Sequence, residues 1–288
     1  MKKKIVLFDV DGTLVKAGGS GLKALNRAIV EMGGKDNICD FFELQGSTDK
    51  ANFTSAFFAA FGRKPSRKEF LGLQKRYLKL LPGEVGRAVK EKRYIKIRGI
   101  KKFLGVLAKR EEVLIGLGTG NLKEGAYLKL GPSGFSHYFL CGGFGTDSFK
   151  REKVLLKAVE RAEKILKEKI KPEQVYVIGD TEKDIEAAKF CGYHIGIVLD
   201  GFGDIKKINR NEPEIKEKDF SDLNGWLIWL GLKKDPKGVK RGSYVCPDTP
   251  IEHAYYGMTG AGSFLDSGDF KMMEKLIKKA RKEKKFRV

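Results

Sequence analysis

Hydrophobic residues in the first 200 positions fall into short apolar runs separated by longer amphipathic stretches. The runs cover 4–8, 113–117, 175–178 and 195–199, with a weaker one at 138–141. Each run has the length of a buried strand. The stretches with apolar residues at helical spacing cover 100–110, 123–130, 151–168 and 182–191. This alternation predicts an α/β fold in which helices cover both faces of a parallel sheet.

Two regions depart from the alternation. Residues 16–89 carry apolar residues at helical spacing near 20–32, 49–61 and 67–80, without a strand pattern. They predict an all-helical insert directly after the first strand, so that the α/β core consists of 1–15 and 90–230. Residues 231–288 are rich in Gly, Pro and Asp and end in a Lys-rich amphipathic pattern. They predict a C-terminal extension that ends in a basic helix.

Pairs of carboxylates follow two of the predicted strands. Asp9 and Asp11 come directly after the first run, and Asp180 and Asp184 come after the run at 175–178. The carboxyl ends of parallel strands share one edge of a sheet, where ligands bind. A lone Asp-x-Asp-Gly is more often a solvated turn, but two such clusters on equivalent strand ends suit an octahedral Mg²⁺.

A third strand end reads Gly118-Thr119-Gly120-Asn121. A hydroxyl and flexible backbone amides at this position can hold phosphate oxygens, especially where a helix begins. By itself this segment is also an ordinary turn. Beside the carboxylate clusters, it predicts a phosphate-binding loop.

These segments, in this order, resemble the motifs of the haloacid dehalogenase-like superfamily. Asp9-Val10-Asp11-Gly12-Thr13 is similar to its first motif, Thr119 to its second, and the segment from Gly179 to Asp184 to its fourth. The helical insert resembles the cap of the phosphoglycolate phosphatase-like branch. The resemblance implies a Rossmann-like parallel sheet core with an inserted all-helical cap domain.

The resemblance also implies a chemistry: a Mg²⁺-dependent phosphohydrolase that acts on a small phosphorylated metabolite through an aspartyl phosphate. Asp9 would be the nucleophile, and Asp11 would exchange protons with the leaving group and with water. Asp11 favours phosphoryl chemistry over dehalogenation, which needs no proton donor. The implied metal group comprises Asp9, the Val10 carbonyl, Asp11, Asp180 and Asp184. The implied phosphate- and substrate-binding group comprises Thr119, Gly12, Thr13, Gly120 and Asn121.

The third motif of the superfamily supplies a cation, usually a Lys before Pro. Here the segment reads Lys150-Arg151-Glu152-Lys153, which offers three cations and no Pro. Arg151 is the first choice because it opens the predicted helix 151–168. Lys153 and Lys150 remain alternatives.

Within the insert, Gly46-Ser47-Thr48-Asp49 resembles a cap turn of the same branch. Thr48 and Asp49 are therefore candidates for contact with the leaving group of the substrate. The competing interpretation is that Ser47 or Thr48 caps the helix 49–61.

The formal net charge of +20 admits a polyanionic partner. The basic residues are spread over the whole chain, however, as in heat-adapted proteins rich in Lys and Glu. We therefore do not expect nucleic acid as a partner, and a nucleic-acid-binding protein with an accessory phosphatase site is kept as an alternative, as is a phosphotransferase or nucleotidase of the same superfamily. Four dispersed cysteines, no secretory signal and no membrane-spanning stretch lead us to expect a cytoplasmic protein.

Overall fold

The computed structural model describes residues 2–41 and 46–232. All but the first two residues of the predicted C-terminal extension, including its basic helix, lie outside this range. Among the described helices, none combines the length and the apolar character needed to span a bilayer.

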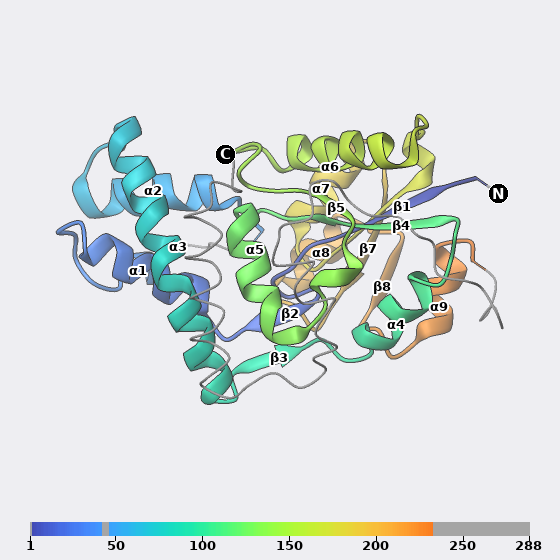
Figure 1. Cartoon of the computed structure of the whole chain (residues 1–288), viewed down its shortest axis with the longest axis horizontal. Helices are drawn as coiled ribbons and strands as arrows, with labels where there is room; N and C mark the ends of the chain where they lie inside the picture. Colours follow the sequence, from blue (N-terminus) through green and yellow to red (C-terminus); the bar gives the residue numbers. More distant parts are fainter. Residues whose placement is uncertain (1, 42–45, 233–288) are drawn as a thin grey trace, which may run out of the picture.

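The core is a six-stranded parallel sheet, which confirms the predicted α/β fold (Figure 1). Its strands, in sheet order, are β5 (Cys141–Gly143), β4 (Val113–Gly118), β1 (Lys4–Phe8), β6 (Val175–Gly179), β7 (His194–Val198) and β8 (Ile215–Glu217). The strand predicted at 138–141 instead begins at its last residue. It continues through two glycines, which have no apolar side chain to signal a strand.

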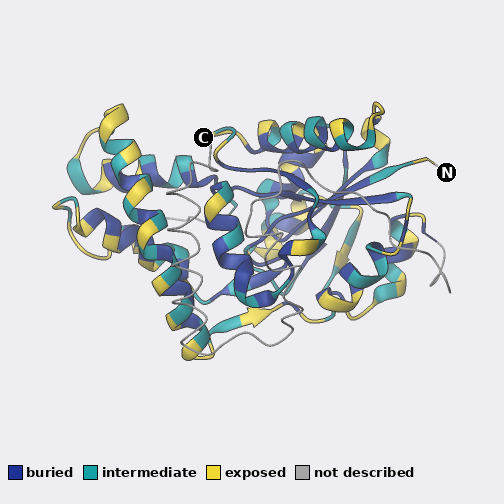
Figure 2. Ribbon diagram, viewed as in Figure 1, coloured by how far each residue is buried: buried dark blue, intermediate teal, exposed yellow. Residues whose placement is uncertain are grey.

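Helices cover both faces of this sheet because alternate residues of β1 point to opposite sides. Val6 and Phe8 belong to one hydrophobic cluster, and Ile5 and Leu7 to another. The first cluster is completed by α4 (Ile100–Leu107), α5 (Lys123–Leu130) and α9 (Leu223–Trp229). The second is completed by α6 (Arg151–Leu166), α7 (Glu182–Phe190) and α8 (Ile205–Arg210). Burial accordingly concentrates in the strands and in the inward faces of the helices (Figure 2).

The residues after β1 form the predicted helical insert, which lies beside the sheet (Figure 1). Its elements are α1 (Ser20–Val30), the 3₁₀ turn η1 (Ile38–Phe41), α2 (Asp49–Phe61) and α3 (Arg67–Lys90). They enclose a hydrophobic cluster of their own, which Leu122 and Leu128 of the core complete. The predicted helix 67–80 is too short: α3 continues through Pro82, a residue that usually ends a helix.

A small antiparallel ribbon marks where the chain leaves the core and returns to it. It pairs β2 (Val15–Ala17) with β3 (Tyr94–Lys96). Neither strand was predicted, because three residues are too few to show an alternating pattern. Short 3₁₀ turns occur at η2 (Gly131–Ser133), η3 (Ser136–Tyr138) and η4 (Pro172–Gln174).

The order of the strands determines where a ligand can bind. From β1 the chain passes to β4 and β5 on one side, and later to β6, β7 and β8 on the other. This reversal creates a crevice at the carboxyl ends of the central strands. The segments that follow β1, β4 and β6 therefore meet at one edge, and these are the three segments with candidate chemistry.

Candidate active site

Asp9 directly follows β1, and its backbone N–H continues the sheet by donating to the Ile178 carbonyl at 2.9 Å. The chain then turns sharply at Gly12, which has a left-handed φ of +83°. A Cβ at this position would lie 2.1 Å from Asp180 Oδ2. Glycine is therefore required here, because it permits both the left-handed turn and the close approach to the second carboxylate.

Three carboxylates form a buried acidic cluster at this edge. Asp9, Asp180 and Asp184 each contribute an oxygen, and these oxygens lie within 4.8 Å of one another. Asp180 Oδ1 accepts a hydrogen bond from the Thr13 hydroxyl at 3.3 Å, and Oδ2 accepts one from the Phe202 N–H at 2.7 Å. The predicted convergence of the two strand ends thus occurs in the structure.

Asp184 is held in place because it caps its own helix, α7. Its Oδ2 accepts hydrogen bonds from the Thr181 N–H at 3.0 Å and the Thr181 hydroxyl at 2.8 Å. The Asp180 N–H donates to the same oxygen at 3.2 Å. The start of α7 therefore directs Asp184 back toward the end of β6.

Arg151 is the cation that reaches this cluster. Its Nη2 lies 3.1 Å from Asp9 Oδ1, and its Nε donates to Asp184 Oδ1 at 2.9 Å. Lys150 and Lys153 are exposed. A helix turns about 100° per residue, so Lys153, two positions after Arg151, lies on nearly the opposite face of α6. The geometry favours Arg151 over both sequence alternatives.

The cluster carries more negative charge than Arg151 can balance. Burial raises the pKa of Asp9, an effect that Arg151 and the Thr119 hydroxyl oppose. Burial, reinforced by the charges of Asp184 and Asp9, also raises the pKa of Asp180. In addition, no described residue donates a hydrogen bond of good geometry to the buried Asp9 Oδ1. Several hard oxygen atoms with uncompensated charge fit a divalent cation such as Mg²⁺.

The structure uses two other predicted metal ligands differently. The Val10 carbonyl accepts hydrogen bonds from the Leu14 N–H at 3.0 Å and the Val15 N–H at 3.1 Å. Both of its lone pairs are thus engaged in the turn, so Val10 is not available as a metal ligand. The Asp11 carboxylate does not join the acidic cluster and instead contacts a lysine.

That lysine, Lys129, was not predicted as a site residue. Its Nζ lies 2.6 Å from both Asp11 Oδ2 and Asn121 Oδ1, and its side chain is only 7% exposed. A signal was present in the sequence: Lys129 shares one face of α5 with Gly125 and Ala126, both buried. A lysine on the apolar face of a helix indicates a buried charge that needs a polar partner.

Acidic neighbours keep Lys129 charged. Burial acts to lower the pKa of its ammonium group, but the charges of Asp11 and Asp49 and the Tyr77 hydroxyl raise that pKa above its ordinary value. Lys129 therefore acts as a permanent cation and hydrogen-bond donor in the site.

The phosphate-loop candidates lie between the acidic cluster and Lys129. The Thr119 N–H donates to the Gly143 carbonyl at 3.1 Å. The Thr119 hydroxyl accepts a hydrogen bond from Asn121 Nδ2 at 2.8 Å, and Asn121 also donates to Asp11 Oδ2 at 2.9 Å. Thr119 and Asn121 are thus buried in one network with Asp11.

The segment 46–49 of the insert is attached to this loop. Thr48 caps α2, as its hydroxyl accepts from the Ala51 N–H at 3.4 Å, and it donates to the Phe149 carbonyl at 3.0 Å. The Asp49 N–H donates to the Gly120 carbonyl at 2.7 Å, and Asp49 Oδ2 accepts from the Leu122 N–H at 2.8 Å. The capping interpretation of Thr48 is confirmed, and the described polar contacts of Thr48 and Asp49 join the insert to the core.

Gly120 makes this attachment sterically possible. A Cβ on Gly120 would lie 2.4 Å from the Ser47 carbonyl oxygen, a distance that no side chain tolerates. On the other side of the segment, Lys183 Nζ donates to the Ser47 hydroxyl at 2.7 Å. The insert therefore contacts the residues that follow both β4 and β6.

Replacing Asp49 with Asn is expected to reduce the pH dependence of stability. Burial raises the pKa of Asp49 to about 6, so the folded state binds this proton more tightly than the unfolded state does. The stabilisation from Asp49 is complete below about pH 4 and is lost as the pH rises toward 6. Asp49→Asn should remove this loss, which amounts to about 3 kcal/mol at most.

Urea unfolding at pH 4.5 and at pH 7.5, both without Mg²⁺, measures how much the free energy of unfolding changes between the two pH values. The matched control is Asp36→Asn, which changes an exposed carboxylate of the insert and should leave the difference as it is in the wild type. An Asp49→Asn protein whose unfolding free energy changes with pH as much as the wild type would contradict this prediction.

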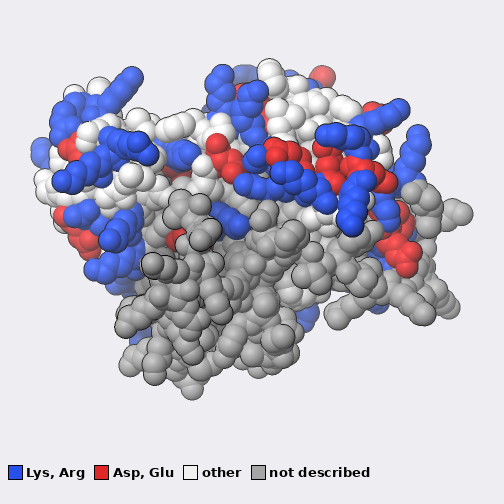
Figure 3. All heavy atoms as spheres, turned by 45° about the horizontal axis from the view of Figure 1, so that its top comes forward, with Lys and Arg blue, Asp and Glu red and all other residues white. Residues whose placement is uncertain are grey.

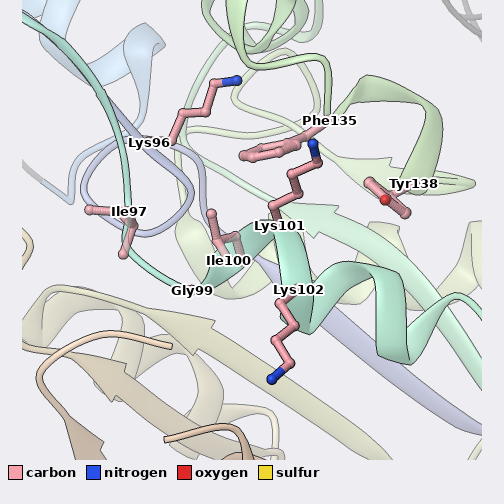
Figure 4. A pocket seen from close by; sticks show the side chains of 8 residues that line it. All are labelled: Lys96, Ile97, Gly99, Ile100, Lys101, Lys102, Phe135 and Tyr138. Carbon is pink, nitrogen blue, oxygen red and sulfur yellow. The ribbon is translucent and has the colours of Figure 1, made fainter. Parts of the chain in front are cut away.

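A cavity of about 490 Å³ lies elsewhere, between β3, the start of α4 and the turns that follow α5 (Figure 4). None of the described residues that line it is a carboxylate: its walls are Lys96, Ile97, Gly99, Ile100, Lys101, Lys102, Phe135 and Tyr138. Basic side chains also occur over the insert and along the core on the face drawn in Figure 3, with acidic ones among them. Among the described residues of that face, basic and acidic side chains are interspersed, a pattern that does not favour the nucleic-acid alternative.

Comparison with known proteins agrees with this geometry. A phosphoglycolate phosphatase from Aquifex aeolicus (strain VF5) is 27% identical over 229 residues, which cover 76% of this chain and 94% of the relative. A predicted phosphoglycolate phosphatase from Haemophilus somnus 129pt shares the fold with a TM-score of 0.59 at 17% identity, covering 78% of this chain and 98% of that one. CbbY from Rhodobacter sphaeroides, in complex with phosphate, has the same TM-score and identity, covering 80% and 100%. Residues 3–192 match the haloacid dehalogenase-like hydrolases, and the chain belongs to that family.

Proposed function

We propose that this hydrolase is a Mg²⁺-dependent phosphomonoesterase that forms an aspartyl phosphate on Asp9. One observation carries the proposal: a buried cluster of three carboxylates and one arginine at the carboxyl edge of the sheet, with Asp11 beside it. The relative from Aquifex aeolicus, which is named as a phosphoglycolate phosphatase, supports the same reaction class.

Asp9 and Asp180 would hold the metal ion, with Asp184 next to them. When bound, Mg²⁺ offsets the charges of the nucleophile and the phosphate, which otherwise repel each other. Arg151 and the Thr119 hydroxyl are donors at the same edge and would bind phosphate oxygens. The backbone N–H groups around Gly120 can add to this binding.

The reaction proceeds in two steps. A carboxylate oxygen of Asp9 attacks phosphorus, the bond from phosphorus to the leaving oxygen breaks, and Asp11 donates a proton to that oxygen. Asp11, now ionised, takes a proton from a water molecule that attacks the aspartyl phosphate. The bond between phosphorus and the Asp9 oxygen breaks and inorganic phosphate leaves. Asp9 is then again ionised and Asp11 again protonated, as at the start of the reaction.

The helical insert would act as the cap of this site, with 1–15 and 90–230 as the core domain. Its hydrogen bonds to Gly120 and Leu122 support this division, because they bring the insert against the phosphate loop. A cap in this position excludes water from the reacting groups and surrounds the leaving group. The substrate is accordingly a small phosphorylated metabolite of the phosphoglycolate type.

Metal removal tests the proposal. Hydrolysis of 4-nitrophenyl phosphate is expected with Mg²⁺ and should fall at least about 100-fold with EDTA, because the metal supplies several kcal/mol of charge stabilisation. Activity should return when Mg²⁺ is restored in excess. Hydrolysis at the same rate in EDTA would contradict the metal-dependent mechanism. A panel of phosphorylated metabolites, assayed with Mg²⁺, would identify the preferred leaving group.

A further inference from the structure

Lys129, Asn121 and Asp11 form a closed triangle of hydrogen bonds. Lys129 Nζ donates to Asp11 Oδ2 and to Asn121 Oδ1, both at 2.6 Å. The Asn121 amide donates to the same Asp11 oxygen at 2.9 Å, which closes the triangle. Each member thus restrains the other two, and Asn121 connects the triangle to Thr119.

The triangle determines which oxygen of Asp11 can meet a substrate. Within the described part of the chain, both hydrogen bonds to this carboxylate end on Oδ2. Oδ1 is therefore the oxygen left for a leaving group or a water molecule. Two donors on Oδ2 also prevent rotation of the carboxylate, which would exchange the two oxygens. A proton donor held in one orientation is what efficient general acid catalysis requires.

Lys129 is itself held where the insert meets the core. Its neighbours include the Tyr77 hydroxyl of α3 and the Asp49 carboxylate at the start of α2, which both interact electrostatically with its ammonium group. A Cβ on Gly21 of α1 would lie 3.2 Å from Lys129 Nζ and 3.4 Å from the Tyr77 hydroxyl. The three α-helices that are described in the insert therefore each place a residue near the ammonium group and help to hold it on Asp11.

We propose that Lys129 is a positioning residue that, together with Asn121, orients the Asp11 carboxylate so that Oδ1 exchanges protons with the leaving group and with water. This inference rests on the proposed phosphatase function and deepens it. Lys129 carries no proton to the substrate. Its effect on catalysis passes through Asp11.

The dependence of the rate on the leaving group separates this role from a structural one. An alkyl phosphate needs a proton on its leaving oxygen, whereas 4-nitrophenolate leaves readily as an anion. The test therefore compares 2-phosphoglycolate, the alkyl substrate, with 4-nitrophenyl phosphate, the aryl substrate. The parameter compared is kcat/KM, because it reports the first phosphoryl transfer and not the later hydrolysis. In Lys129→Met, kcat/KM should fall about 100-fold for the alkyl substrate and less than about 3-fold for the aryl one.

Two further variants complete the test. Lys164→Met makes the same change on the exposed face of α6 and should leave both substrates unaffected. If Lys129→Met does not fold, Lys129→Met/Asp49→Asn removes one of the two carboxylates that have lost their cation, and the same difference between substrates is expected. Asn121→Ala, which removes the second donor, should show the difference to a smaller degree.

Equal losses on both substrates, or no loss on either, would overturn the positioning role of Lys129. Asp9→Asn distinguishes that result from failure of the proposed function. An inactive Asp9→Asn with equal losses in Lys129→Met overturns only the role of Lys129, whereas an active Asp9→Asn overturns the phosphatase mechanism and this inference with it.

Discussion

Asp9→Asn is expected to abolish hydrolysis of phosphomonoesters while leaving the fold intact. An amide of the same shape cannot act as the nucleophile, so kcat should fall by at least about 10⁴-fold, as it does when other enzymes lose their nucleophile. The variant should be at least as stable as the wild type without Mg²⁺. Burial raises the pKa of Asp9, which shows that its ionised form is costly in the folded state.

Steady-state hydrolysis of 4-nitrophenyl phosphate with Mg²⁺, beside thermal unfolding of the same sample, measures both outcomes. Asp36→Asn changes an exposed aspartate of the insert and should keep full activity. A folded Asp9→Asn protein that hydrolyses the substrate at a rate near that of the wild type would exclude Asp9 as the nucleophile.

Arg151→Met is expected to reduce both stability and activity. The buried guanidinium lies against Asp9 and Asp184, and removing one partner of a buried ion pair costs about 3–5 kcal/mol. Loss of a cation that faces the transferring phosphate should lower kcat by about 100- to 1,000-fold. Arg151→Lys should recover only part of both losses, because an ammonium group cannot contact two carboxylates as the planar guanidinium does.

Unfolding in urea without Mg²⁺ measures the loss of unfolding free energy, and steady-state kinetics at saturating Mg²⁺ measure the loss of kcat. Lys153→Met distinguishes the alternatives within the same segment. Lys153 is exposed on α6, so this variant should retain the stability and activity of the wild type. A loss of activity in Lys153→Met with none in Arg151→Met would assign the third-motif cation to Lys153.

Stability without metal is also linked to the acidic cluster. Asp9 and Asp180 both have raised pKa values because of burial, so the folded apoprotein binds protons more tightly than the unfolded chain. Its stability therefore falls as the pH rises above the ordinary range of carboxyl groups. A bound divalent cation opposes this fall because it binds the ionised carboxylates of the folded state.

The sequence by itself determined the fold class and the convergence of the acidic residues. Strands that are covered by helices on both faces have few side chains in contact with water, so the runs 4–8 and 175–178 are continuous apolar segments in the sequence. Parallel strands share one carboxyl edge, and Asp9 and Asp180 therefore had to approach each other once the strands were identified. Local chemistry was equally readable where it involves neighbouring residues, as in the capping of α2 by Thr48.

Only the tertiary structure decided which side chains from distant segments share that edge. Arg151 and Lys153 are equivalent as charges in the sequence, and they differ because the packing of α6 turns one inward and the other outward. The Val10 carbonyl and the attachment of Asp49 depend on backbone hydrogen bonds that no residue pattern reports. The same holds for Lys129. Its contact with Asp11 depends on the packing of α5 against the loop that contains Asn121 and against the helices of the insert, and the sequence around Lys129 does not show this packing.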